Sequence, residues 1–302
     1  MSSRVAAPAG RRSGLATLAL VGVTASWGST FFLIKDLLDR VPAADFLALR
    51  FCIAAVVLAV VSPAAVRRMS RRARRQGLVL GGVYGVAQLL QTIGLESTDA
   101  SVSGFITGMY VVATPVLAGW LLRERIPHVV WLAIALSTAG LAVLSLRGLS
   151  IGPGEALTFA AAMLYALHIV GLGAWSSTQD AYGLAVLQMA VIAVVAALPT
   201  AYDGITLPTR ADDWVAVLYM ALVSGALALL AQTWAQAHLT ATRAAIVMTL
   251  EPVFAAAFAV ALGGESVTTR MAVGGGFVLA AMYLVELTPG RHLEGEVPHL
   301  AQ

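Results

Sequence analysis

Residues 240–264 read TATRAAIVMTLEPVFAAAFAVALGG and are followed by Glu265. The stretch is mostly apolar, and roughly 20 such residues are enough for a helix to cross a bilayer. Glu251 lies near its middle, where a carboxylate costs about 2–3 kcal/mol unless it faces protein or water. Pro252 follows and has no N–H, so it leaves a carbonyl one turn earlier without a helical donor. The stretch therefore predicts a membrane helix that borders an internal cavity rather than lipid.

A second stretch has the same layout. Residues 99–124 read DASVSGFITGMYVVATPVLAGWLLRE, with a small polar start, a long apolar span, an internal proline and a terminal glutamate. The chain is therefore expected to contain two related halves. A shift of 141 residues places Glu124 on Glu265, Tyr110 on Glu251 and Gln91 on Gln232, and a shift of 138 places Trp27 on Tyr165, Thr30 on His168 and Arg50 on Gln188.

The composition excludes a soluble domain. Of the 302 residues, 59% are hydrophobic and 12% are charged, whereas soluble domains have about 45–50% apolar and about 25% charged residues. The single cysteine, Cys52, lies in an apolar span, so no disulfide is possible within the chain. The net charge of +3 does not indicate a nucleic-acid partner, because the arginines cluster at the ends of apolar spans.

Hydropathy and helix breakers predict an all-α integral membrane protein with ten transmembrane helices. Five helices in each half is an odd number, so the halves must cross the membrane in opposite senses, as two inverted five-helix repeats (5+5). Such repeats are a transporter design, in which rocking of the halves gives alternating access to a site between them. The predicted spans are 14–34, 44–62, 77–96, 100–122, 128–146, 154–175, 181–200, 213–236, 240–262 and 268–287.

Charge predicts the orientation of the chain. With both termini in the cytoplasm, 13 of the basic residues lie on the cytoplasmic side and five on the other, which is the usual bias. The run RRMSRRARR at 67–75 is most simply a topology anchor, with lipid binding as the alternative. We expect a cytoplasmic tail at 1–13, a first repeat at 14–148, a second repeat at 149–288 and a cytoplasmic tail at 289–302.

The order and spacing of several short motifs resemble the drug/metabolite transporter superfamily, and more narrowly its EamA type. These motifs are WGSTFFLIK at 27–35, ADFLALRFCIAA at 44–55, Glu251-Pro252-Val253, and the repeat ends Arg123-Glu124 and Gly264-Glu265. One departure is Arg123, which replaces the small residue common before the first-repeat glutamate. The resemblance covers residues 14–288 and implies ten helices and secondary transport of small metabolites, commonly export of amino acids or related compounds. It does not identify the substrate.

Polar residues at helical spacing in a membrane span indicate a face turned away from lipid. Such stripes are expected to line a cavity between spans 1, 3, 4, 6, 8 and 9, although hydrogen bonding between helices is the alternative. Glu124 and Glu265, at the ends of equivalent helices, are read as gates or helix-end contacts. The cavity candidates are Trp27, Thr30, Arg50, Tyr84, Gln88, Gln91, Thr107, Tyr110, Tyr165, His168, Gln232, Gln236 and Glu251.

Three of these candidates are ionisable. Glu251 is expected to bind a substrate amine, to carry a proton or to pair with a basic side chain. Arg50 is expected to pair with a carboxylate in the fold or to meet an anionic group on the substrate. His168 has a pKa range suited to proton coupling, and its alternative is a packed, hydrogen-bonded histidine.

The sequence contains no motif of an enzyme or an ATPase: HExxH, GxSxG, a P-loop and a Cys/His ligand set are all missing. We therefore expect no cofactor, no metal and no catalytic residue. The leading prediction is a secondary transporter of the cell membrane that exports a small polar metabolite. The expected partners are a small-molecule substrate and the lipid bilayer, with proton or ion coupling and oligomeric state left open. The alternatives are a nucleotide-sugar or sugar-phosphate antiporter and a non-transporting scaffold or sensor.

Overall fold

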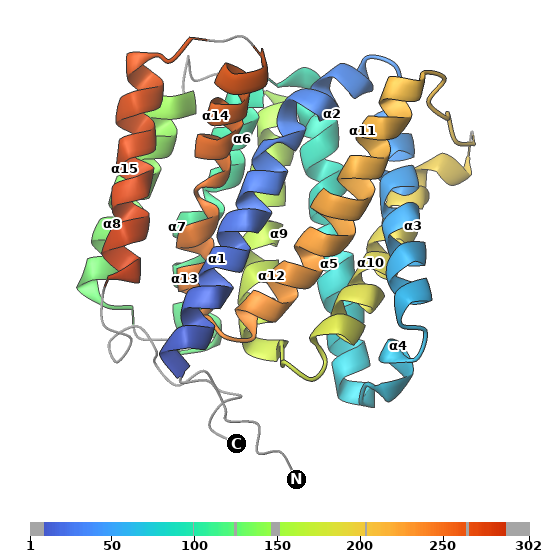
Figure 1. Cartoon of the computed structure of the whole chain (residues 1–302), viewed down its shortest axis with the longest axis horizontal. Coiled ribbons are helices and arrows are strands. Elements are labelled where there is room, and N and C mark those ends of the chain that lie inside the picture. Colours follow the sequence, from blue (N-terminus) through green and yellow to red (C-terminus); the bar gives the residue numbers. More distant parts are fainter. Residues whose placement is uncertain are drawn as a thin grey trace.

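The computed structural model describes residues 9–98, 100–123, 126–145, 152–202, 204–263 and 266–287, and within these residues every regular element is a helix (Figure 1). The first half contains α1 (Ala9–Gly28), α2 (Thr30–Leu38), α3 (Ala43–Val61), α4 (Ala65–Arg68), α5 (Arg71–Ser97), α6 (Ala100–Gly108), α7 (Tyr110–Leu121) and α8 (His128–Ser145). The second half contains α9 (Pro153–Trp175), α10 (Ala181–Ala197), the 3₁₀ turn η1 (Pro199–Ala201), α11 (Ala211–Ala221), the π-helical segment η2 (Leu222–Leu227), α12 (Ala228–Gln236), α13 (Ala241–Met248), α14 (Glu251–Gly263) and α15 (Thr269–Glu286).

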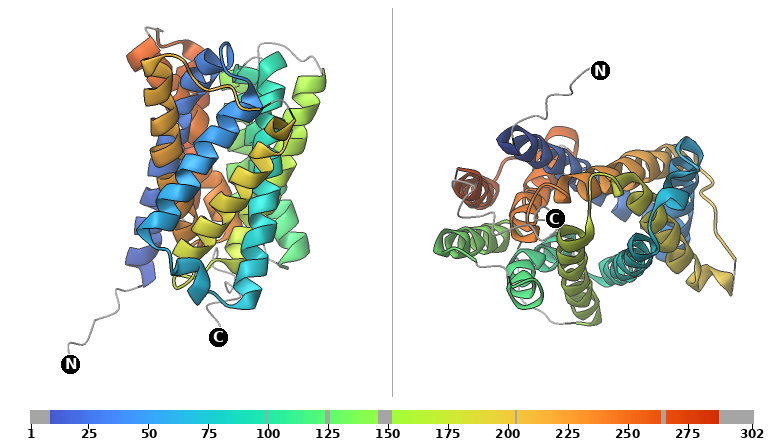
Figure 2. Two further views of the ribbon diagram at one scale, coloured as in Figure 1. Left: turned by 90° about the vertical axis from the view of Figure 1, so that its right-hand side faces the viewer. Right: turned by 90° about the horizontal axis from the view of Figure 1, so that it is seen from below.

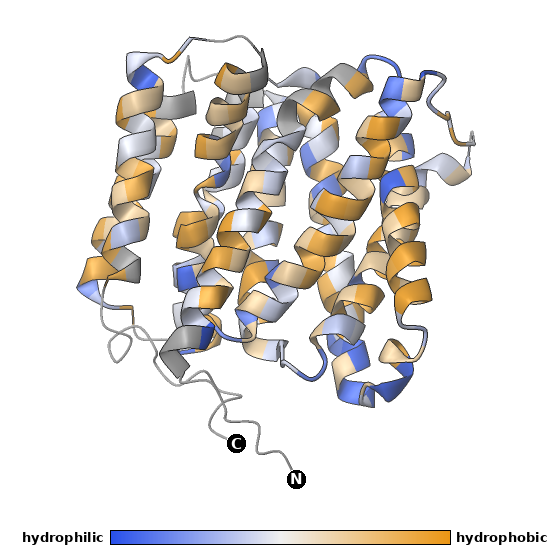
Figure 3. Cartoon of the chain, in the orientation of Figure 1, coloured by the Kyte–Doolittle hydropathy of each residue, from blue (hydrophilic) through white to orange (hydrophobic). Residues whose placement is uncertain are grey.

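These elements form the ten predicted spans, so the prediction of an all-helical ten-span membrane fold is confirmed. Four spans differ from single regular α-helices: α1–α2, α6–α7 and α13–α14 are each broken, and η2 interrupts the eighth. Five helices are long and apolar enough to cross a membrane on their own: Ala43–Val61, Arg71–Ser97, Pro153–Trp175, Ala211–Gln236 and Ala241–Phe258. The helices consist largely of hydrophobic residues (Figure 3), and many large apolar side chains are exposed, such as Val60, Trp120 and Val194, as expected for a surface that faces lipid.

The start of α1 and the end of α15 lie at the same end of the bundle, here called the terminal end (Figure 1). The short helix α4 and the start of α5, which carry the arginine run 67–75, lie there as well (Figure 1). At the opposite end, the turn after α2 is held to α11 by a two-point ion pair. In it, Arg40 donates from Nη2 to Asp213 Oδ1 at 2.7 Å and from Nε to Oδ2 at 3.2 Å.

The breaks in the fourth and ninth spans occur at repeat-equivalent positions. The ninth span breaks at Thr249 and Leu250, whose N–H groups donate to carbonyls three residues back, those of Ile246 and Val247. Pro252 explains this break, because it cannot donate to the carbonyl of Met248. The fourth span breaks at Met109, which lies 141 residues before Leu250. Tyr110 and Glu251 therefore each begin the second part of a broken helix.

Helix packing repeats between the halves in the same way. The first span packs on the third and fourth spans of the other half in both directions: α1 contacts α12, α13 and α14, and α9 contacts α5, α6 and α7. Equivalent spans also meet each other, as α3 with α10, α7 with α13, and α8 with α15. The α8–α15 pair lies at one side of the bundle (Figure 2). These reciprocal contacts interlock the two halves around the centre of the molecule.

Candidate functional site

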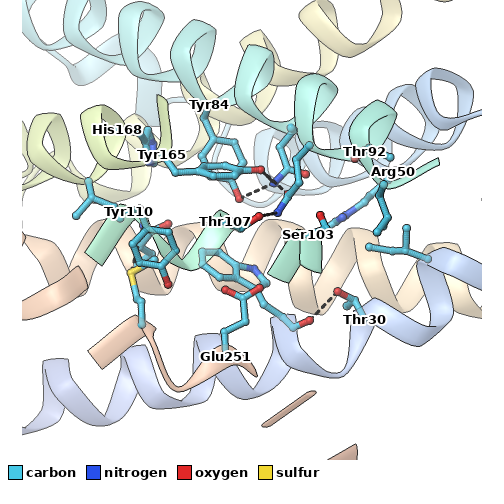
Figure 4. A pocket seen from close by; sticks show the side chains of 18 residues that line it. Thr30, Arg50, Tyr84, Thr92, Ser103, Thr107, Tyr110, Tyr165, His168 and Glu251 are labelled. Carbon is cyan, nitrogen blue, oxygen red and sulfur yellow. Dashed lines mark hydrogen bonds between the residues drawn. The ribbon is translucent and has the colours of Figure 1, made fainter. Parts of the chain in front are cut away.

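A cavity lies at the centre of the bundle, where α1, α2, α3, α5, α6, α7, α9, α12, α13 and α14 meet (Figure 4). The space between its lining atoms, counted together with the solvent at its open mouth, is about 770 Å³. Twelve of the predicted cavity residues line it: Trp27, Thr30, Arg50, Tyr84, Gln88, Gln91, Thr107, Tyr110, Tyr165, His168, Gln232 and Glu251. Ile34, Thr92, Leu95, Ser103, Ile169 and Met248 complete the lining.

Gln236 does not line the cavity. It is fully buried, and its Nε2 donates to the carbonyl oxygen of Ile169 at 2.9 Å. The helical spacing of four residues from Gln232 placed it on the same face, but α12 packs that turn against α9. Two further candidates, Glu124 and Glu265, lie outside the described residues. The structure also adds the second span to the predicted lining, through Arg50 on α3.

A directed chain of hydrogen bonds crosses one wall of the cavity. Gln88 Nε2 donates to the Tyr165 hydroxyl at 2.7 Å, and this hydroxyl donates to Gln91 Oε1 at 2.7 Å. Gln91 Nε2 then donates to Thr107 Oγ1 at 2.9 Å. The chain joins α5, α6 and α9, and it uses both ends of the Gln91 amide. The polar residues in this wall therefore both line the cavity and form hydrogen bonds between helices.

His168 is held by a second pair. Gln188 Nε2 donates to the carbonyl of Leu184 at 3.2 Å, so Gln188 Oε1 is the atom that meets His168 Nε2 at 2.8 Å. An amide oxygen only accepts, so His168 carries a hydrogen on Nε2. The ring of His168 also packs on Tyr84, with ring centroids 4.8 Å apart. This geometry agrees with the packed, hydrogen-bonded alternative for His168.

Arg50 lies 5% exposed on α3 and donates to backbone carbonyls rather than to a carboxylate. Its Nε meets the oxygen of Met220 at 3.0 Å and its Nη2 that of Ser224 at 3.3 Å. Both carbonyls belong to the region of the π-helical segment η2, where the regular ladder is widened. Trp27 Nε1 donates to the same Ser224 oxygen at 2.9 Å. Arg50 thus anchors η2, and it has no carboxylate partner among the described residues.

Arg50→Met is expected to lower the free energy of unfolding by about 2–4 kcal/mol, because the carbonyl of Met220 loses its buried donor and that of Ser224 loses one of two. Arg50→Lys should recover part of this loss, since a single ammonium cannot reach both oxygens as a planar guanidinium does. Thermal unfolding of the purified protein measures both. Arg210→Met removes an exposed arginine and should change little. Equal melting temperatures for Arg50→Met and the wild type would contradict the anchoring role.

Glu251 begins α14 and reaches the cavity from its broken span (Figure 4). A negative charge in the first turn of a helix is favoured by the helix dipole. The carboxylate makes no hydrogen bond or ion pair with any side chain in the part of the chain that the structure describes. Arg50 and Glu251 lie apart on the wall, with no dashed line between them (Figure 4). The cavity wall therefore carries one basic and one acidic side chain that form no ion pair with each other.

Repeat equivalence divides most of the lining into two matched sets. The charged set is Trp27, Thr30, Arg50, Gln232, Met248 and Glu251. Their counterparts under the shifts of 138 and 141 residues, here called the tyrosine set, all line the cavity except Gln188. They are Tyr165, His168, Gln188, Gln91, Thr107 and Tyr110. Equivalent contacts recur, since Gln91 Nε2 meets Thr107 Oγ1 at 2.9 Å and Gln232 Nε2 meets Met248 Sδ at 3.9 Å. The two sets occupy equivalent helix positions in the two repeats, but only the charged set contains ionisable residues of opposite sign.

Comparison with known proteins gives the family. The sequence matches the EamA-like transporter family over residues 14–146 and 152–287. An uncharacterized transporter of Archaeoglobus fulgidus is 26% identical over 275 residues, which cover 91% of this chain and 85% of the relative. A crystal structure of another protein has a TM-score of 0.77 at 18% identity and covers 92% of this chain and 98% of its own, which shows a shared fold. The chain belongs to the EamA-like transporter family, and it is a multi-pass membrane transporter of small molecules rather than an enzyme.

Proposed function

We propose that this transporter exports small polar metabolites, with amino acids as the substrate class, by alternating access across the cell membrane. The observation that carries the proposal is that one basic and one acidic side chain, Arg50 and Glu251, line the same central cavity without an ion pair between them. An isolated charge in a membrane protein is costly and marks a substrate or ion pathway. A zwitterion brings one charge of each sign and leaves the occupied site neutral.

In this proposal the solute carboxylate meets Arg50 and the solute ammonium meets Glu251. Two donors of the Arg50 guanidinium bind the carbonyls of Met220 and Ser224, and its Nη1 has no hydrogen bond with the described residues. The side chain of the solute then faces Tyr84, Tyr110 and Tyr165. These rings supply apolar area together with hydroxyl groups, which suits side chains of varied chemistry.

The distribution of lining residues supports alternating access. Lining residues extend from the middle of the bundle toward the end opposite the termini, as Ile34, Leu95 and Ser103 do. At the terminal end, hydrogen bonds join neighbouring helices: Gln236 Nε2 donates to the carbonyl of Ile169, and Arg243 Nη1 donates to Ser13 Oγ at 2.9 Å. A cavity that reaches one end and is closed at the other is what one state of a rocking transporter requires.

Two rival substrates and one rival class are less well supported. A nucleotide sugar or a sugar phosphate brings several negative charges, and Arg50 is the one lysine or arginine among the described residues that line the cavity. A scaffold or sensor would bind the solute without moving it. Flux measurements separate that case from transport.

The orientation proposed here places the terminal end in the cytoplasm, because the arginine run 67–75 lies there. On intact cells, an impermeant maleimide should label Thr206→Cys, in the loop at the opposite end, and should spare Arg68→Cys. Both variants need Cys52 replaced by serine first. Labelling of Arg68→Cys alone would reverse the orientation.

The transport test uses the full-length protein in proteoliposomes and a panel of labelled amino acids, with and without an imposed pH gradient. We expect flux of at least one amino acid above that of empty vesicles. A rate that responds to the gradient would add proton coupling. Absence of flux for every amino acid would contradict the proposed substrate class, and binding without flux would indicate a sensor.

A further inference from the structure

A pair of glutamine amides on α12 has a fixed direction. The carbonyl oxygen of Ile169 can only accept, so the Gln236 atom that meets it at 2.9 Å must be Nε2. Gln236 Oε1 is then the atom that receives Gln232 Nε2 at 3.1 Å. The same Gln232 nitrogen also reaches Met248 Sδ at 3.9 Å. Hydrogen-bond chemistry therefore turns the Gln232 nitrogen toward Gln236 and leaves the Gln232 oxygen on the other side.

That oxygen has no donor. Gln232 is 1% exposed and lines the cavity, and its Oε1 is buried without a hydrogen-bond partner. A buried acceptor without a partner is unfavourable and rare in native proteins. Its repeat counterpart behaves differently, because Gln91 Oε1 accepts from the Tyr165 hydroxyl at 2.7 Å.

The difference arises from Trp27, which is the counterpart of Tyr165. The indole N–H of Trp27 is the equivalent donor, but it is directed to the carbonyl of Ser224 at 2.9 Å. Trp27 therefore donates to Ser224 and not to Gln232, and the Gln232 oxygen can accept from a donor outside the chain.

The broken ninth span adds Met248 and Glu251 to the lining of the same cavity. The Glu251 carboxylate has no partner among the described side chains, and Pro252 has no N–H to donate to the carbonyl of Met248. Unwound backbone carbonyls in discontinuous helices are common cation ligands in transporters. Gln232 and Glu251 thus each bring to this cavity side-chain oxygen that has no partner among the described residues.

From this arrangement we infer that Gln232 Oε1 and Glu251 together bind the ammonium group of the solute, and that Gln236 is a positioning residue for Gln232. The inference rests on the proposed function. It adds Gln232 as a second protein group that binds the ammonium, and Gln236 as the residue that orients Gln232. An ammonium has three donors and one positive charge, which a single carboxylate does not saturate. Gln236 touches no solute. It acts by keeping the Gln232 oxygen turned away from Gln236.

The experiment compares equilibrium binding of three matched pairs to the full-length protein in detergent. The pairs are L-alanine with L-lactate, L-leucine with 2-hydroxyisocaproate, and L-phenylalanine with phenyllactate, in which a hydroxyl replaces the ammonium. We expect the wild type to prefer the amino acid in at least one pair. Gln232→Met should reduce this preference about tenfold, the value of one hydrogen bond to a charged group. Gln236→Met should reduce it by a smaller factor, about threefold, because Gln232 can then turn either way.

Gln91→Met is the matched control, since it makes the same change at the repeat-equivalent position, where both ends of the amide are already satisfied. It should weaken both members of a pair equally and leave the preference unchanged. A purely structural role of Gln236 would likewise weaken both members equally, which would overturn its assignment as a positioning residue. If Gln232→Met does not fold, the preference of Gln236→Met still decides the question.

Repeating the measurements in potassium chloride instead of sodium chloride separates the ammonium from an inorganic cation. The inference is overturned if Gln232→Met keeps the amine preference and loses a sodium dependence that the wild type has. It is also overturned if the wild type binds none of the six compounds. Amine-selective binding without flux in proteoliposomes would support this subsite and contradict only the proposed transport.

Discussion

Glu251→Gln is expected to lower flux of a transported amino acid at least about tenfold and to raise the melting temperature of the protein. The flux falls because the amide cannot form a charge-assisted hydrogen bond with an ammonium. Stability rises because an unpartnered carboxylate in a membrane span is costly, and the amide of equal size is not. A gain of about 1 kcal/mol would raise the melting temperature by about 2–4 °C. Opposite changes in activity and stability are typical of residues kept for function.

Proteoliposome flux and thermal unfolding of the same preparation measure the two changes. Glu96→Gln is the control, because Glu96 is an exposed glutamate near the end of α5 that lies outside the cavity lining. It should alter neither quantity. Wild-type flux of Glu251→Gln across a pH series would mean that Glu251 neither carries a proton nor contacts the substrate.

Gly28→Ala is expected to lower the free energy of unfolding by about 1–3 kcal/mol and to impair transport, although it changes no cavity side chain. A Cβ at Gly28 would lie 2.7 Å from the carbonyl oxygen of Glu251 and 2.8 Å from the nitrogen of Ala255. These are backbone atoms, so they cannot move aside as the end of a flexible side chain can. The methyl group would push α1 away from α14 at the residue that begins the second part of the ninth span.

Gly22→Ala on the same helix is the matched control for this prediction. A Cβ at Gly22 would meet no atom within 4 Å, and alanine favours a helix over glycine by up to about 1 kcal/mol. Thermal unfolding in detergent should therefore rank Gly22→Ala at or above the wild type and Gly28→Ala below it. A Gly28→Ala protein that melts with the wild type would show that this helix crossing tolerates a wider spacing.

The fold and most of the cavity lining could be predicted from the sequence, because a polar side chain in an apolar span is unfavourable in lipid and must face protein or a cavity. Glu251, Gln91 and Tyr84 are costly in lipid, and helical spacing gives the face on which they lie. The repeat shifts added Trp27, Thr30 and His168, which have no polar stripe of their own. Ile34, Leu95 and Ile169 were missed, because an apolar side chain that faces a cavity has the same sequence signal as one that faces lipid.

Arg50 and Gln236 show that local sequence patterns do not predict hydrogen-bond partners that depend on helix packing. The partners of Arg50 are the carbonyls of Met220 and Ser224, which become available only where η2 widens the helix. No residue type in this stretch predicts a π-helical segment. Gln236 is turned toward Ile169 by the packing of α12 on α9. The break at Met109 was hidden as well, although the equivalent position in the ninth span is marked by Pro252.

Membrane proteins are made from the N-terminus to the C-terminus, so α1 and α3 enter the bilayer before α11 and α12 exist. During that interval the side chains of Ser26, Trp27 and Arg50 lack the hydrogen-bond partners that they have in the finished fold, which lie on η2 or α11. Until the second half is made, the first five spans are therefore an incomplete unit in the bilayer, in which these polar side chains lack those hydrogen-bond partners. A chain that stops after α8 should be cleared by quality-control proteases, unless the second half is supplied as a separate polypeptide to complete it.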